Sequence, residues 1–514
     1  MQGKILFILI ATLALLGMSS KIRIDTSSKK FIDENNRVLL FHGVNAVYKL
    51  EPFYPPILDH FDPTLSLSPQ DFQNLRSWGF NFIRLHIAWE GVEPTRGNYN
   101  DTYILQIRQI VRTAAQYNIT VLLDAHQDLM SRKFCGEGFP AWAINHTNFP
   151  APFKINITYD EKGYANITQC LQMPFFKYYL TKNVQKAWED FYTNENGTRD
   201  SFANMWQHVA TFFKDEPNII GYEILNEPFS ADLYEDPTSI IYAQKDDIKF
   251  LQPLYSEVHK RVREVDNNTI LFFEPMVDDA TGVGLQKGPG GPGYNDKQAL
   301  SHHVYCGIVD NDGEPDVPAV CHGIDSFMFK NHQKNADKIG IPAFLTEFGA
   351  VSNSSRSATE ISYVADLADE HLNSWSYWQF KGYNDITTQA RPASIEGFYD
   401  EKGNLQSEKV KALSRNYFYA TCGLPIKQHF NHKTAEFTFT YKPKNNCNGA
   451  NSELFISEDF YYPNGFTYKF QGCDQCKLAS LGPKGYYQVV LAGKYSEQIT
   501  LEVKATTKTT EIDI

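Results

Sequence analysis

The chain has 514 residues, a formal net charge of −12 at pH 7 and a pI near 5.6. This length permits two or three domains, or one large barrel with an appended domain. The acidic balance argues against nucleic acid, and against an anionic membrane surface, as the main partner.

The first twenty residues have the order of a secretory signal peptide. Lys4 precedes the apolar run ILFILIATLALLG, and Met18, Ser19 and Ser20 follow it. The run is too short to cross a bilayer comfortably, so a retained anchor helix is the less favoured alternative. We therefore expect residues 1–20 to be a signal peptide and the protein to be secreted, to the extracellular space or to the lysosome.

Cysteines and glycosylation sequons agree with secretion. Eight cysteines, an even number, suit an oxidising compartment and disulfide bonds. We expect Cys135 to pair with Cys170, Cys306 to pair with Cys321, and the other four to cross-link the C-terminal domain. In a secreted chain, a high density of N-x-S/T sequons favours a glycoprotein. The sequons begin at Asn100, Asn118, Asn145, Asn156, Asn166, Asn196, Asn267 and Asn353.

Eight short apolar or β-branched segments recur between residues 38 and 380, separated by amphipathic or loop-like stretches. Strands that alternate with helices indicate a parallel sheet, and near-continuous apolar strands indicate burial on both faces. Eight such units fit a (β/α)₈ TIM barrel, an α/β fold, better than an open doubly wound sheet. The segments are VLLFHGVN from Val38, FNFIRLHI from Phe80, ITVLLDAH from Ile119, IIGYEILNE from Ile219, TILFFEP from Thr269, ALSHHVY from Ala299, PAFLTEFG from Pro342 and SWSYWQF from Ser374.

Nearly every one of these segments ends in a polar side chain. In a barrel, the C-terminal ends of the strands converge on one mouth, where the chemistry takes place. We therefore expect the strand-end residues to form a single site. They are Asn45, Arg84, His86, His126, Asp128, Asn226, Glu227, Glu274, His303, Tyr305, Glu347, Trp378 and Gln379.

Two carboxylates stand out, Glu227 and Glu347. Each follows an apolar strand in a tight local context, NEP and TEFG, and the fourth and seventh strands lie across the mouth of a barrel. A retaining glycosidase needs two carboxyl groups about 5–5.5 Å apart, one protonated to donate to the leaving oxygen and one ionised to attack the anomeric carbon. The alternative is that each glutamate is an ordinary salt-bridge partner. We expect the pair to be catalytic.

The neighbouring residues suit a supporting role. Asn226 is placed to hydrogen-bond a sugar 2-hydroxyl. Arg84 and Tyr305 are expected to contact Glu347, with Arg84 holding it ionised and lowering its pKa. For each residue taken alone, a purely structural role is the alternative. The remaining candidates are His126 and His303, for hydroxyls or polar atoms of the site, and Trp378, for stacking on a pyranose ring.

The sequence gives no sign of a metal or cofactor site. His126, Asp128, His302 and His303 are the residues that offer potential ligands, but they have neither HExxH nor CxxC spacing. We therefore expect no metal ion at these residues.

Beyond about residue 422 the pattern changes to period-two alternation with Gly, Pro and Asn turns. Stretches such as EFTFTYKP, GFTYKFQG and QITLEVKA are typical of an antiparallel β-sandwich of about ninety residues. We expect a barrel domain at residues 21–422 and a β-sandwich domain at residues 423–514.

The chain resembles the glycoside hydrolase family 5 barrels, and among them the animal-type endoglycoceramidases. The resemblance covers residues 31–418 and extends into the sandwich. The motifs that carry it are GVNAVYK at Gly43, RLHIAWEGVEP at Arg84, DAHQD at Asp124, GYEILNEPF at Gly221, SHHVY at Ser301, LTEFGA at Leu345 and SYWQFKGY at Ser376.

The resemblance implies a role for each site residue. Glu227 would be the acid/base and Glu347 the nucleophile, while Lys49 and Asp128 would hold sugar hydroxyls. The residues implied to surround the scissile sugar are Asn226, His126, Tyr305, Arg84 and Trp378. The implied reaction is hydrolysis of the β-linkage between a glycan and ceramide, with retention of configuration and without a cofactor.

One long insertion bears on the lipid half of such a substrate. The stretches FCGEGFPAWAINHTNFPAPF from Phe134 and CLQMPFF from Cys170 are unusually apolar and aromatic. They either line a groove for acyl and sphingoid chains or pack on the outer helices of the barrel. The sequence leaves both possibilities open.

We expect a monomer that acts on a glycosphingolipid, either a ganglioside or a neutral glycolipid, and that contacts a membrane or micelle surface transiently. One alternative is another family 5 glycosidase, namely a β-glucanase, a glucosylceramidase or a steryl glucosidase. A different class is a glycolipid-binding protein without catalysis, which the presence of both glutamates disfavours.

Overall fold

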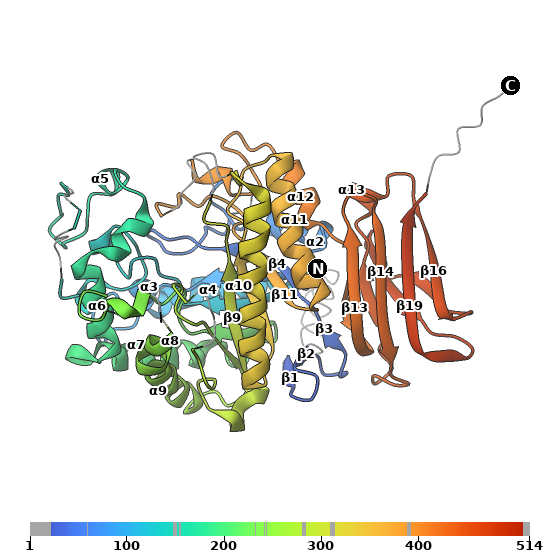
Figure 1. The fold of residues 1–514 in the computed structure, drawn as a ribbon, viewed down its shortest axis with the longest axis horizontal. Helices are drawn as coiled ribbons and strands as arrows, with labels where there is room; N and C mark the ends of the chain where they lie inside the picture. Colours follow the sequence, from blue (N-terminus) through green and yellow to red (C-terminus); the bar gives the residue numbers. More distant parts are fainter. Residues whose placement is uncertain are drawn as a thin grey trace, which may run out of the picture.

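The computed structural model describes residues 22–506, except 59, 147–151, 154–155, 232, 241, 243, 280–283, 309–313 and 388–391. The expected signal peptide, residues 1–20, lies outside the described residues. The chain folds into a (β/α)₈ barrel with a sandwich of two antiparallel sheets beside it, which confirms the expected fold class (Figure 1). None of the helices described is long and apolar enough to cross a membrane.

The eight expected segments form the eight parallel strands of a closed barrel, in which β11 pairs with β4 to complete the ring. Apart from the half-buried Thr120, every residue of these strands is buried, because helices cover the outside and side chains fill the inside. The strands are β4 (His42–Ala46), β5 (Phe82–His86), β6 (Thr120–Asp124), β7 (Ile219–Glu223), β8 (Ile270–Phe273), β9 (Gln298–Val304), β10 (Ala343–Phe348) and β11 (Ser374–Tyr377).

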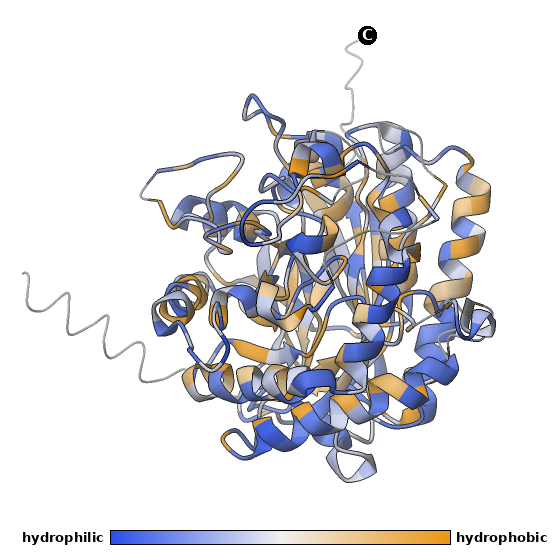
Figure 2. Ribbon diagram, turned by 90° about the vertical axis from the view of Figure 1, so that its left-hand side faces the viewer, coloured by the Kyte–Doolittle hydropathy of each residue, from blue (hydrophilic) through white to orange (hydrophobic). Residues whose placement is uncertain are grey.

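Helices surround the barrel. The outer helices carry alternating bands of hydrophilic and hydrophobic residues (Figure 2), as expected where one face packs on the strands and the other meets water. The longer helices are α2 (Pro69–Ser77), α4 (Asp101–Gln116), α6 (Lys182–Tyr192), α7 (Thr198–Phe213), α9 (Gln252–Arg263), α10 (Pro318–Ile339), α11 (Ser355–Glu370) and α12 (Ser407–Leu413). The shorter ones are α3 (Trp89–Val92), α5 (Ile167–Cys170), α8 (Gln244–Asp246) and α13 (Glu458–Tyr461).

The sandwich consists of a seven-stranded and a four-stranded sheet. In order, the first contains β1 (Arg23–Asp25), β2 (Lys30–Ile32), β3 (Val38–Leu39), β12 (Tyr417–Thr421), β15 (Ser452–Phe455), β18 (Tyr486–Val490) and β17 (Lys477–Ser480). The second contains β13 (Gly423–Asn431), β14 (Glu436–Pro443), β19 (Tyr495–Ala505) and β16 (Phe466–Cys473). The expected boundary at residues 422–423 falls between β12 and β13, and the first sheet draws strands from both sides of it.

Four disulfide bonds account for all eight cysteines. Cys135 pairs with Cys170 and Cys306 pairs with Cys321, as expected. The other two bonds, Cys422–Cys447 and Cys473–Cys476, lie in the C-terminal part of the chain. The predicted pairings are therefore confirmed.

Candidate active site

Both glutamates of the expected pair line one cavity at the mouth of the barrel. Glu227 follows β7, the fourth barrel strand, and Glu347 lies in β10, the seventh. The cavity has a volume of about 500 Å³, within the range of small-molecule sites. Of the strand-end residues expected to form the site, all line the cavity except Asn45, Arg84, His86 and Gln379. Lys49 also lines it, and Arg84 is fully buried and contacts Glu347.

The two carboxyl groups are close together. One carboxyl oxygen of Glu227, one of Glu347 and a ring nitrogen of His303 all lie within 4.8 Å of one another. Retaining glycosidases hold their carboxyl groups about 5–5.5 Å apart, whereas inverting enzymes leave about 6.5–9.5 Å to admit a water molecule. The geometry therefore fits direct attack on a sugar carbon by a carboxylate.

A β-bulge directs Glu347 into the cavity. Where β10 pairs with β9, Leu345 lies opposite His302, and the next pair is Glu347 with His303. Thr346 is thus an extra residue on β10, which shifts the inward and outward alternation of the strand. The bulge places Glu347 on the same face as His303.

A turn after β7 positions Asn226 and Glu227. The backbone N–H of Asn226 donates to the Ala125 carbonyl oxygen at 3.1 Å. The side-chain amide of Gln127 donates to the carbonyl oxygens of Asn226 and Glu227, at 2.8 and 3.0 Å. Glu227 has a φ of 40°, in the left-handed region that residues other than glycine seldom adopt. The turn, held by Gln127, therefore aims the acid side chain at the cavity.

Arg84 is fully buried among carboxylates. Its Nη1 donates to Glu347 Oε1 at 2.5 Å, and its Nη2 donates to Asn226 Oδ1 at 2.8 Å. The guanidinium also contacts Asp124, at 3.1 Å, and Glu223. Burial works against the charge, but the surrounding acids outweigh it and raise the pKa of Arg84 well above its usual range. Arg84 is therefore a permanent cation behind Glu347.

The expected lowering of the Glu347 pKa is wrong in its net direction. Burial raises the pKa of this carboxyl, and the charge of Glu227 adds to the rise. His303, Arg84 and the Tyr305 hydroxyl, which donates to Glu347 Oε2 at 2.8 Å, act in the opposite direction without cancelling it. The expected contacts are present, but burial is the larger effect.

His303 lies between the two glutamates. Its Nδ1 is 2.7 Å from Glu227 Oε1 and 3.5 Å from Glu347 Oε2, and its Nε2 is 3.3 Å from Glu274 Oε1. Burial disfavours the charged ring, but Glu274 and Glu347 outweigh it and raise the pKa of His303 well above its usual range. Burial also raises the pKa of Glu274, to about 8. Glu347 is thus flanked by His303 and Arg84, both of them cations.

Lys49 organises the polar end of the cavity. Its Nζ is 2.5 Å from Asp128 Oδ2 and 3.2 Å from Asp385 Oδ2, and it donates to the Thr387 hydroxyl. It also lies 4.9 Å from the centre of the Trp378 ring. Burial alone would lower the pKa of Lys49, yet the nearby acids raise it well above its usual range. Polar groups held in fixed directions suit the hydroxyls of a sugar.

His126 and Trp378 form a flat wall beside these groups. Their ring centres are 5.2 Å apart and the ring planes differ by 18°. Each ring is fixed by a hydrogen bond, from His126 Nδ1 to Asp124 at 2.8 Å and from Trp378 Nε1 to Glu396 at 3.1 Å. A fixed aromatic face suits the apolar face of a pyranose ring.

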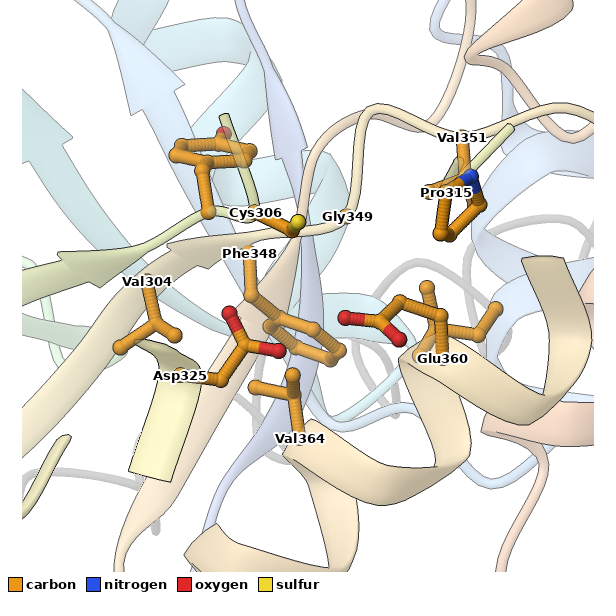
Figure 3. Close-up of a pocket in the computed structure, with 11 residues that line it drawn as sticks. Val304, Cys306, Pro315, Asp325, Phe348, Gly349, Val351, Glu360 and Val364 are labelled. Atoms are coloured by element: carbon orange, nitrogen blue, oxygen red, sulfur yellow. The ribbon is translucent and has the colours of Figure 1, made fainter. Parts of the chain in front are cut away.

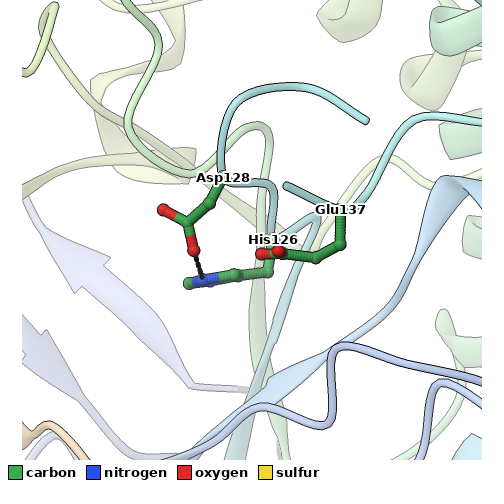
Figure 4. Close-up of side chains that lie close together, drawn as sticks. All are labelled: His126, Asp128 and Glu137. Atoms are coloured by element: carbon green, nitrogen blue, oxygen red, sulfur yellow. Dashed lines mark ion pairs between the residues drawn. The ribbon is translucent and has the colours of Figure 1, made fainter. Parts of the chain in front are cut away.

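His126, Asp128 and Glu137 bring three potential metal-ligand atoms within 4.8 Å of one another (Figure 4). The Lys49 ammonium lies 2.5 Å from Asp128 and 3.7 Å from Glu137. The protein itself therefore supplies a cation where these carboxylates would attract one. This arrangement favours sugar binding over metal binding.

The other end of the cavity, where Glu274, His302 and His332 also line it, has a largely apolar wall. It is lined by Phe175 and Phe176 from the insertion after β6, by Met276 and Val277 after β8, and by Met328 on α10. In the ring of eight strands, β8 lies opposite β4, which carries the polar end. The strands β7 and β10, with the two glutamates, lie between the two ends. The cavity is therefore amphipathic, with the carboxyl pair at the junction.

The apolar insertion is divided between the protein core and the cavity. Phe139 is buried in the outer core of the barrel. Phe175 and Phe176 instead line the cavity, and Phe176 is 53% exposed. The Cys135–Cys170 disulfide ties the two halves of the insertion together.

Several residues of the site carried little signal in the sequence. Gln127 and Glu223 were not predicted, although they lie within the DAHQD and GYEILNEPF motifs, whose resemblance to the family was a signal for them. Glu137, Asp385 and Thr387 lie on loops and reach the cavity only through the tertiary fold. No periodicity marks such residues.

A separate cavity of about 10 Å³ lies between α10 and α11, beside the ends of β9 and β10 (Figure 3). The carboxyl groups of Asp325 on α10 and Glu360 on α11 meet there among apolar side chains. Burial raises the pKa of Asp325 to about 9, and the hydrogen bond with Glu360 adds to the rise. Asp325 therefore keeps its proton at neutral pH.

Comparison with known proteins places the chain in a family. The model of the cellulase family, glycosyl hydrolase family 5, matches residues 60–384, and that of the glycoside hydrolase family 5 C-terminal domain matches residues 415–511. Over 452 residues the chain is 34% identical to an endoglycoceramidase of Cyanea nozakii, covering 87% of this chain and 86% of that protein. It is 33% identical over 452 residues to an endoglycoceramidase of Hydra vulgaris, covering 87% and 83%.

A solved structure shares the fold. Endo-glycoceramidase II from Rhodococcus sp., in its ganglioside GM3 complex, matches with a TM-score of 0.72 and 20% sequence identity, over 93% of this chain and 99% of that chain. With the two family models and the two relatives, the assignment is clear. The chain belongs to glycoside hydrolase family 5 and, within it, to the endoglycoceramidases.

Proposed function

We propose that the chain is a retaining endo-β-glycosidase that hydrolyses the linkage between the glycan and the ceramide of a glycosphingolipid, releasing intact oligosaccharide and ceramide. One observation carries the proposal: a single cavity joins a polar end, an apolar end and, between them, two carboxyl groups at the separation of a retaining pair. A substrate made only of sugars would leave the apolar end without a partner. The relatives named endoglycoceramidase support the same substrate class.

In this proposal Glu347 is the nucleophile and Glu227 the acid/base. The Glu347 carboxylate attacks the anomeric carbon, and the ceramide oxygen leaves with a proton from Glu227. Water then gives a proton to Glu227 and cleaves the glycosyl ester, which frees Glu347 and restores the original configuration. Neither step requires a metal ion or an organic cofactor.

The other residues hold the sugar and orient the nucleophile. Asn226, whose side-chain oxygen accepts from Arg84, presents its amide to the 2-hydroxyl of the scissile sugar. Arg84, His303 and Tyr305 orient Glu347. The residues proposed to bind the glycan are Lys49, His126, Asp128 and Trp378.

The test is to incubate the purified protein with a ganglioside and, separately, with a soluble β-glucan, and to identify the products by mass spectrometry. Intact oligosaccharide and free ceramide are expected from the ganglioside, while the glucan stays uncut. Release of single terminal sugars, or cleavage of the glucan alone, would contradict the proposal. Binding without any turnover would instead favour a glycolipid-binding protein.

Two variants test the assignment of the carboxyl pair. Glu347→Gln should bind substrate and fail to turn it over. On an aryl lactoside, whose leaving group departs without a proton, Glu227→Ala should lose activity that azide restores, because azide attacks the glycosyl-enzyme without help from a base. The matched control is Glu257→Gln on the outer helix α9, which should behave as wild type. Normal turnover in Glu347→Gln would remove the nucleophile assignment.

The proposal includes secretion as an N-glycosylated monomer that contacts a membrane or micelle transiently. In support, the asparagine of every one of the eight sequons is exposed. Expression in animal cells should place the protein in the medium, with a mass that falls after treatment with a peptide N-glycosidase. Light scattering should give the mass of one chain. An unglycosylated product retained inside the cell would contradict this part of the proposal.

A further inference from the structure

The first turns of α10 carry a stripe of exposed apolar side chains. Val317, Val320 and Phe327 are 48%, 45% and 55% exposed, and Ile324 is half-buried between them. At 100° per residue, Val320, Ile324 and Phe327 fall within about 60° of one another, on the side of the helix opposite Phe329, which packs on the barrel. Val317 is the N-cap residue just before them. Single exposed apolar residues are ordinary, but three on one side of a helix, with a fourth at its N-cap, form a patch.

This stripe adjoins the active-site cavity. α10 follows β9, so its first turns lie at the mouth end of the barrel, and the Cys306–Cys321 disulfide fixes them to the end of β9. Met328, the residue after Phe327, lines the apolar end of the cavity. Phe176, from another loop, also lines the cavity and is itself largely exposed. The apolar end of the cavity is therefore continuous with an apolar rim.

We propose that the stripe formed by Val317, Val320, Ile324 and Phe327 docks the protein on an uncharged lipid bilayer that carries its substrate. This inference rests on the proposed function, because it takes the lipid part of the substrate into the apolar end of the cavity. A glycolipid that leaves a bilayer exposes its acyl chains to water unless another apolar surface covers them. An apolar rim that enters the boundary between headgroups and acyl chains shortens that exposed path.

The distribution of charge selects an uncharged surface over an anionic one. Between Val317 and Met328 there is no lysine, arginine or glutamate, and the one carboxyl group, that of Asp325, is buried. The stripe therefore has no basic side chains to attract anionic headgroups. The net charge of −12 would also repel an anionic surface. Docking relies on apolar burial, which needs no headgroup charge.

The test uses the full-length secreted protein and phosphatidylcholine vesicles that contain a neutral glycosphingolipid. In the double variant Val320→Asp/Phe327→Asp, co-flotation with vesicles should fall by about tenfold or more, and so should kcat/KM on the vesicle-embedded glycolipid. The reason is that burying one such apolar side chain in the bilayer changes the affinity by about tenfold or more. Activity on a water-soluble aryl lactoside and on a short-chain, monomeric glycolipid should stay at the wild-type level, because the variant leaves the carboxyl pair unchanged.

The matched control is Leu424→Asp/Ile426→Asp on β13 of the sandwich, where the two side chains are 44% and 41% exposed. The control should bind vesicles as the wild type does. Unchanged binding and rate in the stripe variant, an equal loss in the control, or no vesicle binding by the wild type would each overturn the proposal. So would a wild-type dimer that the stripe variant converts to monomer without any vesicle binding. Failure of the wild type to cleave the short-chain glycolipid would instead remove the proposed function.

Discussion

Asp128 and Glu137 share the Lys49 ammonium in a buried space. Backbone N···O hydrogen bonds of 2.9 and 3.3 Å join the two acids, and Glu137 is fully buried. Burial raises the pKa of Glu137 well above its usual range. Burial also opposes ionisation of Asp128, but the Lys49 ammonium outweighs it and holds the Asp128 pKa well below its usual range. Burial therefore favours the protonated form of Glu137, which can donate a hydrogen bond to the Asp128 carboxylate.

Replacing Glu137 tests whether this donor positions Asp128 for the sugar. Glu137→Gln keeps an N–H donor and should leave KM nearly unchanged. Glu137→Ala removes the donor and should raise KM about tenfold, since a hydrogen bond to a charged group is worth roughly 1.5–3 kcal/mol. In both variants kcat should change less, because the reacting carboxyl groups lie elsewhere. Steady-state kinetics on a soluble aryl lactoside provide the check, and equal KM values for the two variants would contradict the role.

Site residues at the ends of the barrel strands could be predicted from the sequence, because the barrel brings all strand ends together. Glu227 and Glu347 were found because the carboxyl ends of barrel strands converge on one mouth. Glu137 was missed because it reaches Asp128 through a pairing between loops, which leaves no period in the sequence. The net direction of the Glu347 pKa was predicted wrongly because the depth of its burial depends on the whole fold.

Whether a strand could be predicted from the sequence depended on its length. The barrel strands are buried apolar runs of four to seven residues, long enough to be recognised. β1, β2 and β3 have only three, three and two residues, and they precede the barrel in the chain although they belong to the sheet of the sandwich. The bulge at Thr346 depends on the register between β9 and β10, which pattern alone does not contain.

The pairing of Asp325 on α10 with Glu360 on α11 makes the packing of these helices sensitive to pH. Asp325 has a pKa near 3.8 when unfolded and about 9 when folded. Between these values the folded chain keeps a proton that the unfolded chain has lost. The contribution of this group to stability is therefore complete below about pH 4 and declines as the pH rises towards 9.

Asp325→Asn should remove this dependence, because the amide still donates to Glu360 and does not titrate. The difference in Tm between the variant and the wild type should become more positive from pH 5 to pH 9, by at least ~2 °C. Thermal unfolding followed by circular dichroism at several pH values measures the trend. Asp337→Asn, on an exposed position of the same helix, is the control and should show no trend. A constant difference for Asp325→Asn would rule out the raised pKa of Asp325.

At the scale of the whole molecule, the barrel and the sandwich share one apolar cluster. Leu40 and Leu372 from the barrel side are buried together with Tyr417, Phe455 and Tyr486 from the sandwich. β3, at the start of the barrel domain, also pairs with β12. Separating the two parts would expose this cluster and break a sheet.

A chain that ends at Ser414 should therefore not fold as an independent barrel. It lacks β12, so β3 loses its neighbour, and Leu40 and Leu372 lose the aromatic side chains that cover them. We expect little soluble fragment and no cooperative thermal transition, whereas the full chain should unfold in a single transition. A soluble fragment with the Tm of the full chain would show that the sandwich is a separable module.

Arg415 links the two parts through buried ionic contacts. Its Nε donates to Asp369 Oδ2 on α11 at 2.9 Å, and its Nη2 donates to the carbonyl oxygen of Phe430 in the sandwich at 3.4 Å. Asp369 in turn lies 3.0 Å from Nε2 of His42 in the barrel strand β4. The four residues are almost completely buried. Removing the arginine would leave the Asp369 carboxylate buried with fewer partners.

Arg415→Ala should therefore destabilise the barrel and the sandwich together, by about 3–5 kcal/mol, the usual cost of breaking a buried ion pair. Urea unfolding should show one transition at a lower midpoint. The kcat of the folded variant should match the wild type, because Arg415 is not part of the active-site cavity. The control is Arg261→Ala on the outer face of α9, whose pair with Glu257 is partly exposed and should contribute less than ~1 kcal/mol. If both variants unfold at the same urea concentration, the buried network does not hold the two parts together. If Arg415→Ala gives two transitions, the barrel and the sandwich unfold separately once the network is gone.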